Sequence, residues 1–550
     1  MSAREITAVT FTRQAAKEMT ERLEKRLGKK ACRGLTIGTF HLICLLLLEE
    51  KPLVSRDTAR GIMAEILKDR KETLSPAKAL ELISSLKNGL DVPGLPAGLA
   101  EQYQERLKEK GLRDLDDVLA EALDTPVQDK KMFHYLLVDE YQDINPAQQA
   151  LVRQWSENSR LFVIGDPDQS IYGFRGASAS CFDALKTIRP GAKCIRLKQN
   201  YRSTPEILSC AMEAISHNPG GKRELQAVMP HGASVRLVLA PDERVEYIWI
   251  AKEIARMAGG LGMTEAREGE RAQFAFSEIA VLCRTHRQLE QMEACLNHDS
   301  IPCVVSGRGA FLEADKVQAL LGFFAALLEP EDEAGLTLAL KALWHCPDGL
   351  IQRACAAMSL IKEQSKDAFE EALSPFEALS SFVDAVKAFL PIAAKEKPRA
   401  LLDDLAKRTG IGGKEIDQLL NTAVFFDTFP DFLRVLRMGE EGDVRRLSGG
   451  KASGAVRLMT LHAAKGLEFP AVFLAGLEED QLPLTRRNEE TDTAEERRLF
   501  FVGMTRAKAS LTLVCGGKQS PFLSELPEGI ETVPVKNQSA VKAKQISFLI

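Results

Sequence analysis

The chain has 550 residues, of which 45% are hydrophobic and 27% are charged, and its formal net charge is −5. This length predicts three or four domains of about 100–200 residues each, and the composition is typical of a soluble globular protein. The longest apolar stretch, from Leu42 to Leu48, is much shorter than the roughly 20 residues that cross a bilayer, so no membrane partner is expected. The first residues lack the basic segment and apolar core of a signal peptide. The net charge gives no indication of nucleic acid, so any DNA binding would depend on a local surface.

The eleven cysteines are scattered from Cys32 to Cys515, and none of them forms a CxxC pair. Cys44, Cys283 and Cys515 lie inside apolar runs, where a thiol behaves as a small buried hydrophobic group. This pattern argues for reduced thiols and a cytoplasmic protein, and against a zinc or iron–sulfur site.

Short apolar runs rich in branched residues alternate with helical patterns along much of the chain. The first helical pattern, Arg13–Leu27, places an apolar residue every four positions on one face and has Thr12 as its N-cap. Continuous apolar runs between such helices are typical of buried parallel strands. The predicted strands are Ile6–Val9, Tyr135–Val138, Leu161–Ile164, Ile279–Cys283, Val456–Thr460, Ala471–Ala475 and Leu511–Cys515. The sequence therefore predicts an α/β fold with parallel sheets.

Two long stretches interrupt this alternation with almost wholly helical patterns. The first runs from about Glu49 to Gln128, and the second runs from about Glu313 to Arg446 and ends in the loop Ser448-Gly449-Gly450. Because each stretch lies between α/β segments, each is predicted to be a helical insertion. The predicted first α/β domain comprises residues 1–48 and 129–205 with the insertion 49–128. The second comprises 206–312 and 450–530 with the insertion 313–449, and the polar tail 531–550 is expected to be mobile.

Two adjacent carboxylates, Asp139 and Glu140, follow the predicted strand Tyr135–Val138 directly. In α/β folds that hydrolyse nucleotides, ligands lie beyond the carboxyl ends of the strands. One carboxylate there can hold Mg²⁺ through water, and its neighbour can orient or deprotonate the attacking water. A solvated strand-to-helix turn explains this pair equally well when the pair is taken alone.

The next predicted strand, Leu161–Ile164, leads into a segment that contains Tyr172, Phe174 and Arg175. Exposed aromatic rings beside an arginine are a common platform for the bases of single-stranded DNA. A single aromatic residue is more often a core residue, but two glycines flank Phe174 and make a core position less favourable there.

The order of these segments resembles the UvrD/Rep/PcrA family of superfamily-one DNA helicases. Residues 139–143, Asp-Glu-Tyr-Gln-Asp, are similar to motif II, and residues 165–177, Gly-Asp-Pro-Asp-Gln-Ser-Ile-Tyr-Gly-Phe-Arg-Gly-Ala, are similar to motif III. Further segments match motifs Ia, Ib, IV, V and VI in the family's order, at residues 8–16, 38–41, 200–203, 459–469 and 495–507. The resemblance implies two RecA-like motor domains with parallel sheets, the first truncated at its N-terminus, each with a mainly helical insertion.

The resemblance also implies an ATP site with Mg²⁺. Asp139 would hold Mg²⁺ through water, and Glu140 would be the general base. The side chains expected around the γ-phosphate are Gln169, Arg202 and Arg506, with Arg506 as an arginine finger that stabilises transition-state charge. Tyr201 would stack on adenine, and Glu468 would contact the ribose. A surface ion pair is the structural alternative for Arg202 and Arg506.

The family's single-strand path implies a second set of residues. The side chains expected to line this path are Phe11, Thr12, Thr39, Phe40, His41, Tyr172, Phe174, Arg175 and His462. For His462 alone, a structural histidine would be the commoner explanation, but its place within an eleven-residue motif match favours the DNA role.

No segment of the sequence reads GxxxxGK followed by Ser or Thr, the pattern of a phosphate-binding loop. The Gly-Lys pairs, which all fail this pattern, lie at 28–29, 221–222, 413–414, 450–451 and 517–518. In the family this loop and an adenine-reading glutamine lie upstream of motif Ia, which begins here at Ala8, so both would precede Met1. Without the loop's amides and lysine, the phosphates lose most of their cradle. The chain is therefore predicted to be inactive alone.

Two interpretations of this gap stay open. The chain is either a fragment or mis-started reading frame of a full helicase, or a short protein that binds DNA without hydrolysing ATP. The first is favoured because the residues that would serve only ATP are intact. The predicted function is accordingly that of an ATP-dependent helicase moving 3′ to 5′ on single-stranded DNA, with single-stranded and junction DNA as partners. The alternative is a non-hydrolysing single-strand-binding protein.

Two further possibilities carry less weight. A helicase–nuclease would need another acidic domain, and only 43 residues follow Ala507. The last residues, from Lys544 to Ile550, resemble the short peptides that dock on the bacterial sliding clamp, although a disordered apolar tail is the commoner explanation for so short a match.

Overall fold

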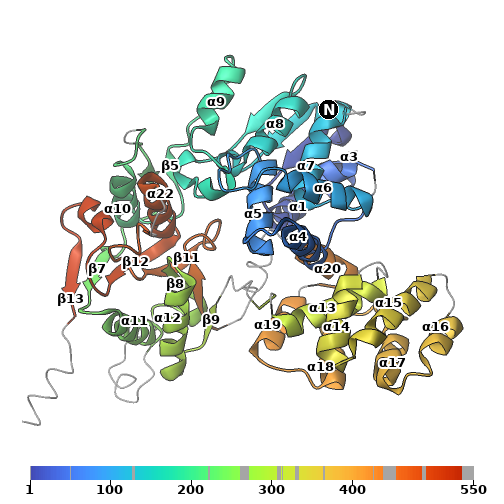
Figure 1. The fold of residues 1–550 in the computed structure, drawn as a ribbon. Coiled ribbons are helices and arrows are strands. Elements are labelled where there is room, and N and C mark those ends of the chain that lie inside the picture. The colour runs from blue at the N-terminus through green and yellow to red at the C-terminus, as the bar shows by residue number, and fades with distance from the viewer. Residues whose placement is uncertain are drawn as a thin grey trace, which may run out of the picture. The chain divides into compact units, whose positions relative to one another are not determined.

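The computed structural model describes residues 2–49, 51–126, 130–220, 223–259, 272–305, 311–312, 314–328, 333–362, 366–424, 426–437, 454–485 and 491–535. The chain divides into two compact units. Unit 1 comprises Met1–Glu140, Ile144–Ile164 and Arg308–Ser448, and unit 2 comprises Tyr141–Asp143, Gly165–Gly307 and Gly449–Ile550. Each unit contains a parallel sheet (Figure 1), so the predicted α/β fold is confirmed. Among the described residues, no helix has the length and apolar character needed to span a membrane.

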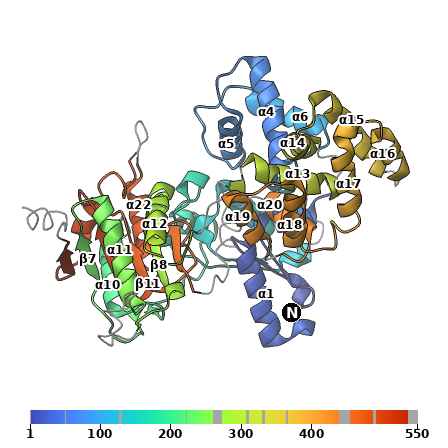
Figure 2. The same ribbon diagram turned by 90° about the horizontal axis from the view of Figure 1, so that it is seen from below.

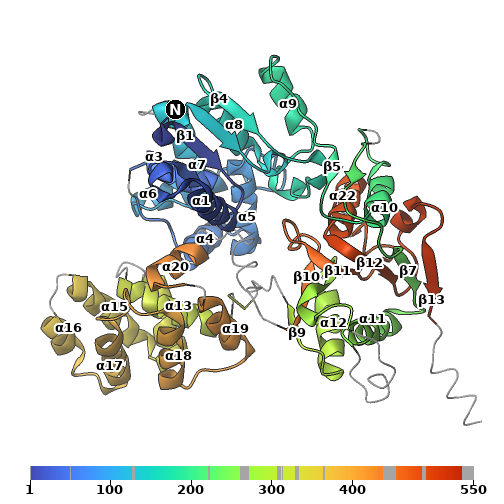
Figure 3. The same cartoon turned by 180° about the vertical axis from the view of Figure 1, so that it is seen from behind.

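The sheet of unit 1 has four parallel strands in the order β2-β1-β3-β4. Figure 3 shows it with β1 and β4 labelled. The strands are β1 (Ile6–Val9), β2 (Thr36–Gly38), β3 (Tyr135–Val138) and β4 (Arg160–Val163). β1 and β3 have the predicted bounds, and β4 begins and ends one residue earlier than predicted. β2 was not predicted, because three residues are too few to show a pattern.

Helix α1 (Arg13–Leu27) follows β1, and the Thr12 hydroxyl accepts a hydrogen bond from the Ala15 amide at 3.2 Å. The predicted helix and its N-cap are therefore confirmed. The other helices beside this sheet are α2 (Lys29–Cys32), α3 (Phe40–Leu47) and α8 (Pro146–Trp155). Trp155 stacks on Phe40 and on Phe133, with ring centroids 6.0 Å and 4.8 Å apart, which fastens α3 and α8 to the segment that enters β3.

Both predicted helical stretches are helical in the residues described, and both belong to unit 1. The first contains α4 (Arg56–Arg70), α5 (Pro76–Lys87), α6 (Leu99–Glu109) and α7 (Leu115–Asp124). The second contains α13 (Asp315–Leu328), α14 (Glu333–Trp344), α15 (Asp348–Lys362), α16 (Lys366–Leu373), α17 (Ser380–Phe389), α18 (Pro398–Thr409), α19 (Lys414–Ala423) and α20 (Phe429–Arg437). In the second stretch the helices pack around α13 and α14 (Figure 1). Apolar residues of these two helices form a large part of the core of this stretch. In the structure α14 contacts α4 of the first stretch, and the predicted assignment of each insertion to its motor domain stays a prediction.

The sheet of unit 2 has seven parallel strands in the order β13-β7-β12-β11-β8-β10-β9. The strands are β7 (Arg236–Leu239), β8 (Ile279–Cys283), β9 (Cys303–Val305), β10 (Val456–Thr460), β11 (Phe469–Leu474), β12 (Ala507–Cys515) and β13 (Glu531–Pro534). β8 and β10 have the predicted bounds. β11 begins two residues and ends one residue earlier than predicted, and β12 begins four residues earlier. The expectation of a mobile tail from Glu531 is wrong for Glu531–Pro534, which pairs with β7. The predicted loop at 448–450 and the peptide at 544–550 lie outside the described residues.

Helices cover both faces of this large sheet. Side chains of α10 (Pro205–Ile215) and α22 (Thr493–Met504) form one core against it. Side chains of α11 (Glu243–Met257) and α12 (His286–His298) form the other core, and Figure 2 shows these two helices beside β8 and β11. All five residues of β8 are buried, because a strand covered on both faces needs apolar side chains throughout. Unit 2 also contains α9 (Cys181–Ile188) and the short parallel pair β5 (Gln199–Asn200) and β6 (Gln226–Ala227).

Candidate functional site

In unit 1 the predicted site residues follow three neighbouring strands. Phe11 and Thr12 follow β1, Thr39 to His41 follow β2, and Asp139 with Glu140 follows β3. Because β2, β1 and β3 are adjacent and parallel, their carboxyl ends form one edge of the sheet, the edge where ligands bind in such folds. The Asp139 amide donates a hydrogen bond to the Val9 carbonyl at 2.9 Å, which fixes the carboxylate pair beside the end of β1.

The backbone of Glu140 adopts a left-handed conformation with φ 51° and ψ 44°. A residue with a side chain is strained there by roughly 1–2 kcal/mol, and such strain concentrates at functional sites. Burial, with the adjacent charge of Glu140, raises the pKa of the Asp139 carboxyl. Within the described residues no three or more His, Cys, Asp or Glu side chains could together hold a metal ion.

Three of the predicted DNA-contacting side chains in unit 1 have structural roles. The hydroxyls of Thr12 and Thr39 cap α1 and α3, and both side chains are buried. Phe40 is only 3% exposed and stacks on Trp155. The predicted contacts of these three residues with DNA stay a prediction. Phe11 and His41 are half-buried.

In unit 2 three predicted DNA-contacting rings gather in one place, and we call Tyr172, Phe174 and His462 the ring cluster. The centroid of Phe174 lies 6.0 Å from both Tyr172 and His462, and Tyr172 lies 6.4 Å from His462. Phe174 is 62% exposed, which excludes the alternative that it is a core residue. The guanidinium of Arg175 lies 5.7 Å from the Tyr172 ring and 5.6 Å from the Phe174 ring. Exposed rings beside a cation can stack bases and attract the adjacent phosphates.

The close approach of α22 to the ring cluster requires a glycine. The Gly173 amide donates to a carboxylate oxygen of Glu495 at 3.0 Å, and a Cβ at Gly173 would lie 2.1 Å from the other oxygen. Burial raises the pKa of Glu495. Arg498, also on α22, donates from Nε to the Ser170 carbonyl at 2.7 Å. These two contacts hold the segment before and within η5 (Gly173–Arg175) against α22.

Arg506, the predicted arginine finger, is 1% exposed, so the alternative of a surface ion pair does not apply to it. Its Nε donates to the Val502 carbonyl at 2.9 Å, and its Nη1 donates to the Leu467 carbonyl at 3.2 Å. Its Nη2 approaches the side-chain oxygen of Gln169 at 3.4 Å. The structure therefore brings together two of the side chains predicted at the γ-phosphate.

Arg202 and Glu468 form a second pair of predicted ATP residues. Arg202 Nε donates to one carboxylate oxygen of Glu468 at 2.7 Å, and Lys508 Nζ lies 2.6 Å from the other. The hydrogen bond from Lys508 and the contact with Arg202 lower the pKa of Glu468. An ionised carboxylate accepts hydrogen bonds and so suits a ribose hydroxyl. Tyr201 is 68% exposed, as a residue that stacks on a base must be, and its hydroxyl bonds Gln199.

Two family models match this chain. The UvrD/REP helicase N-terminal domain matches residues 1–88 and 55–188, and the UvrD-like helicase C-terminal domain matches residues 195–378 and 350–516. The chain belongs to the UvrD/Rep helicase family. The resemblance inferred from the motifs is therefore confirmed, and the family assignment covers both units.

Three relatives in the UvrD/Rep family are similar to this chain over most of its length. The ATP-dependent DNA helicase Rep of Escherichia coli K12 is 30% identical over 96% of this chain and 88% of its own length. PcrA of Staphylococcus epidermidis is 27% identical over 96% of the chain and 80% of the relative. UvrD1 of Mycobacterium tuberculosis is 29% identical over 95% of the chain and 79% of the relative. Among solved structures, the C-terminal domain of a possible DNA helicase from a Lactobacillus strain matches with 11% identity and a TM-score of 0.26, which supports no conclusion.

Some residues that organise the site of this UvrD/Rep family member were not predicted individually. Lys508 holds Glu468, and the Asn200 side chain accepts hydrogen bonds from the amides of Arg202 and Ser203, both at 3.0 Å. Asp143 and Lys465 form a buried ion pair at 2.6 Å. Asn200, Asp143 and Lys465 lie inside motif matches, so their motif context was the available signal. Lys508 lies one residue beyond the match to motif VI, so the sequence gave no signal for it.

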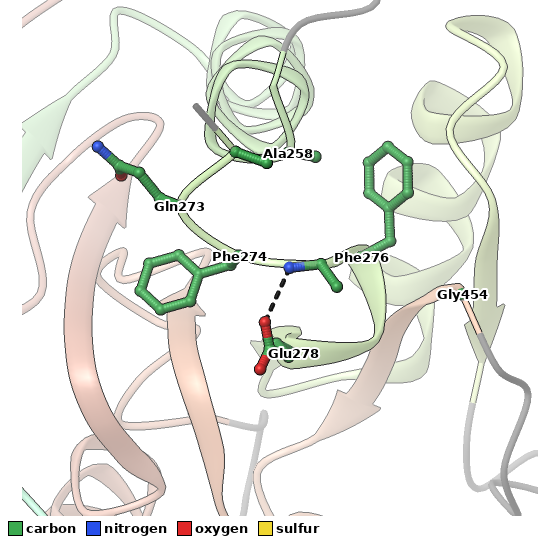
Figure 4. A pocket seen from close by; sticks show the side chains of 8 residues that line it. Ala258, Gln273, Phe274, Phe276, Glu278 and Gly454 are labelled. Carbon is green, nitrogen blue, oxygen red and sulfur yellow. Dashed lines mark hydrogen bonds between the residues drawn. The ribbon is translucent and has the colours of Figure 1, made fainter. Parts of the chain in front are cut away.

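A surface hollow in unit 2 lies apart from all of these predicted residues. Figure 4 shows the side chains that line it. The Ala275 amide donates to the carboxylate of Glu278 at 2.8 Å. The residues that line it are Ala258, Ala272, Gln273, Phe274, Ala275, Phe276, Glu278 and Gly454. None of them is a predicted ATP or DNA residue, so this hollow is not the predicted site.

A buried carboxyl beside the loops that follow β11 and β12 predicts a pH dependence of stability. Glu246 in α11 is 0% exposed and accepts a hydrogen bond from the Gly476 amide at 2.7 Å. Burial, with the charges of Glu478 and Glu243, raises its pKa well above 4.5. The folded protein therefore keeps this proton at a pH where the unfolded chain has released it. The stability that this group contributes is present below the unfolded pKa and is lost as pH rises through the folded pKa.

We expect the Glu246→Gln variant to lack this loss of stability. Urea unfolding between about pH 5 and about pH 8 should show a smaller decline in the free energy of unfolding for Glu246→Gln than for the unmodified chain. Equal declines would mean that Glu246 is ionised in the folded protein.

Proposed function

We propose that this chain binds single-stranded DNA through the ring cluster and belongs to an ATP-driven motor that moves 3′ to 5′ along that strand. The observation that carries the proposal is the gathering of Tyr172, Phe174 and His462 beside Arg175, with Phe174 largely exposed. Successive bases stack on such rings whatever their sequence. The relatives are named ATP-dependent DNA helicases, which supports both the DNA partner and the use of ATP. Single-stranded and junction DNA are the proposed partners.

The nucleotide chemistry proposed for the motor uses carboxylates, arginines and an amide. ATP with Mg²⁺ would supply the phosphoanhydride bond whose cleavage drives movement. Asp139 and Glu140 lie in unit 1, where Asp139 would hold the metal ion through water and Glu140 would take the proton of the attacking water. Arg202, Arg506 and the amide of Gln169 would neutralise charge on the γ-phosphate. Tyr201 would stack on adenine, and Glu468 would accept from the ribose.

For this chain alone we predict little or no hydrolysis of ATP. The 550 residues contain no GxxxxGK loop followed by Ser or Thr, so the backbone amides and lysine that hold the phosphates are missing from it. Phosphate release should stay near background with and without a saturating oligo-dT. DNA-stimulated turnover would contradict this prediction and would mean that other residues supply the phosphate cradle. Such turnover would also identify the chain as an active motor and not only a single-strand-binding protein.

The Phe174→Ala variant tests the DNA part of the proposal. Removing the exposed ring should weaken binding of a fluorescein-labelled oligo-dT by about 5- to 150-fold, which corresponds to roughly 1–3 kcal/mol per stacked base. Fluorescence anisotropy measures the dissociation constant. Phe162→Ala is the matched control, because Phe162 is 52% exposed on β4 in unit 1 and lies outside the ring cluster. If the two variants bind equally well, the ring cluster is not the base platform.

A further inference from the structure

Lys465 is a buried cation in the turn that follows β10. Its side chain is 4% exposed and that of Asp143 is 1% exposed. Lys465 Nζ lies 2.6 Å from each carboxylate oxygen of Asp143. It also donates to the backbone carbonyl of Gln169, and it lies 5.0 Å from the centroid of the Tyr172 ring. An ammonium has three N–H donors, so the two carboxylate oxygens and the Gln169 carbonyl match its capacity.

These contacts join three segments that are distant in the sequence. Asp143 ends the short helix η3 (Tyr141–Asp143), Gln169 ends η4 (Pro167–Gln169), and Lys465 lies three residues after His462. Each member of the ring cluster therefore lies close in sequence to an anchor of this ammonium. Tyr172 is three residues beyond Gln169, and Phe174 is two residues further on.

Burial decides what Lys465 can do. A lysine that binds DNA phosphate needs its ammonium at the surface, whereas this one is enclosed by Asp143, Gln169 and Tyr172. Its charge can reach DNA only through the rings it fixes. Removing one partner of a buried pair leaves the other charge uncompensated, so the three segments would lose their common anchor together.

We propose that Lys465 is a positioning residue for base recognition, which holds Tyr172 and His462 at the spacing that lets a base stack on the ring cluster. The same ammonium holds the backbone of Gln169, whose side chain contacts Arg506, so Gln169 and Tyr172 share one anchor. This inference rests on the proposed function, because it takes the ring cluster to be the base platform.

The test compares two oligomers of equal length and charge, oligo-dT and a fully abasic strand. Phosphate contacts contribute to both, and only bases can stack. The unmodified chain should prefer oligo-dT, and Lys465→Met should reduce that preference about tenfold while its affinity for the abasic strand stays within about twofold.

A double variant, Lys465→Met with Asp143→Leu, separates positioning from stability. Replacing a buried ion pair by apolar residues of similar volume is often neutral for stability, so this variant should stay folded and still lack the preference for bases. Arg284→Met is the matched control. It breaks another largely buried pair of unit 2, with Glu496 at 2.7 Å, and should leave the preference unchanged.

The outcomes distinguish the two proposals. If the unmodified chain shows no preference for oligo-dT, the proposed function fails and this inference fails with it. If the unmodified chain shows the preference and the folded double variant keeps it, the proposed function stands and the role of Lys465 is wrong. An equal loss in Arg284→Met would also overturn the inference, because the effect would then follow from any broken pair.

Discussion

Replacing Asp143 with alanine is expected to lower the free energy of unfolding of unit 2 by about 3–5 kcal/mol, the usual cost of leaving a buried charge without its partner. Asp143 and Lys465 are each 3% exposed, and the ammonium lies 2.6 Å from both carboxylate oxygens. Alanine removes both acceptors but leaves the cation enclosed. Urea unfolding gives the overall change, and hydrogen exchange should show faster opening in η3, η4 and the turn after β10.

The matched control is Asp403→Ala in unit 1. Asp403 also pairs with a lysine at 2.6 Å, but the side chains of Lys407 and Asp403 are 73% and 43% exposed. A pair in water contributes only about 0.3–0.5 kcal/mol at this helical spacing. A loss in Asp143→Ala as small as that in Asp403→Ala would mean that Lys465 finds another acceptor or gains water.

Local rules account for the parts of the fold that the sequence predicted well. The helix Arg13–Leu27 and its Thr12 cap were predicted because capping and amphipathic spacing involve only neighbouring residues. β8 was predicted because a strand covered by helices on both faces is apolar throughout. In contrast, β13 is polar and joins the sheet by backbone hydrogen bonds to β7, which place no demand on side-chain type. β2 and β9 have three residues each and show no periodicity.

The site residues show the same difference between what neighbouring residues determine and what distant residues determine. Asp139, Glu140 and the ring cluster were identified because each lies in a motif whose residue types suit its chemistry. Asp143 and Lys465 also lie in motif matches, but their pairing was not predicted, because 322 positions separate them in the sequence and only the packed structure brings them together. The sequence also did not show which side chains are buried. Phe40 was predicted to line the DNA path, and in the structure its ring stacks on Trp155 in the core. Sequence reasoning thus found chemically suited residues, and the structure showed which side chains are already occupied.

The second large effect is expected at Gly322, where α13 and α14 meet at two glycines. A Cβ on Gly322 would lie 2.4 Å from the Gly335 carbonyl oxygen and 2.8 Å from the Gly335 Cα. Since the obstructing atoms are backbone, the helices themselves must separate. The Gly322→Ala variant should therefore lose about 3 kcal/mol of stability, at the upper end for an overpacked core. This loss is expected although alanine favours a helix over glycine by roughly 1 kcal/mol.

Gly349→Ala isolates that intrinsic preference. Gly349 lies in α15 of the same helical stretch, and a Cβ there would meet no atom within 4 Å. This variant should be more stable by up to about 1 kcal/mol, so the two glycine-to-alanine changes are expected to differ in sign in urea unfolding. Two changes of the same sign would show that α13 and α14 can separate without cost. Because Gly322 lies in unit 1 and the ring cluster in unit 2, affinity for oligo-dT should not change in folded Gly322→Ala. A loss of affinity in this variant would mean that the packing of α13 on α14 influences base binding. The contacts of Lys465 provide no such link.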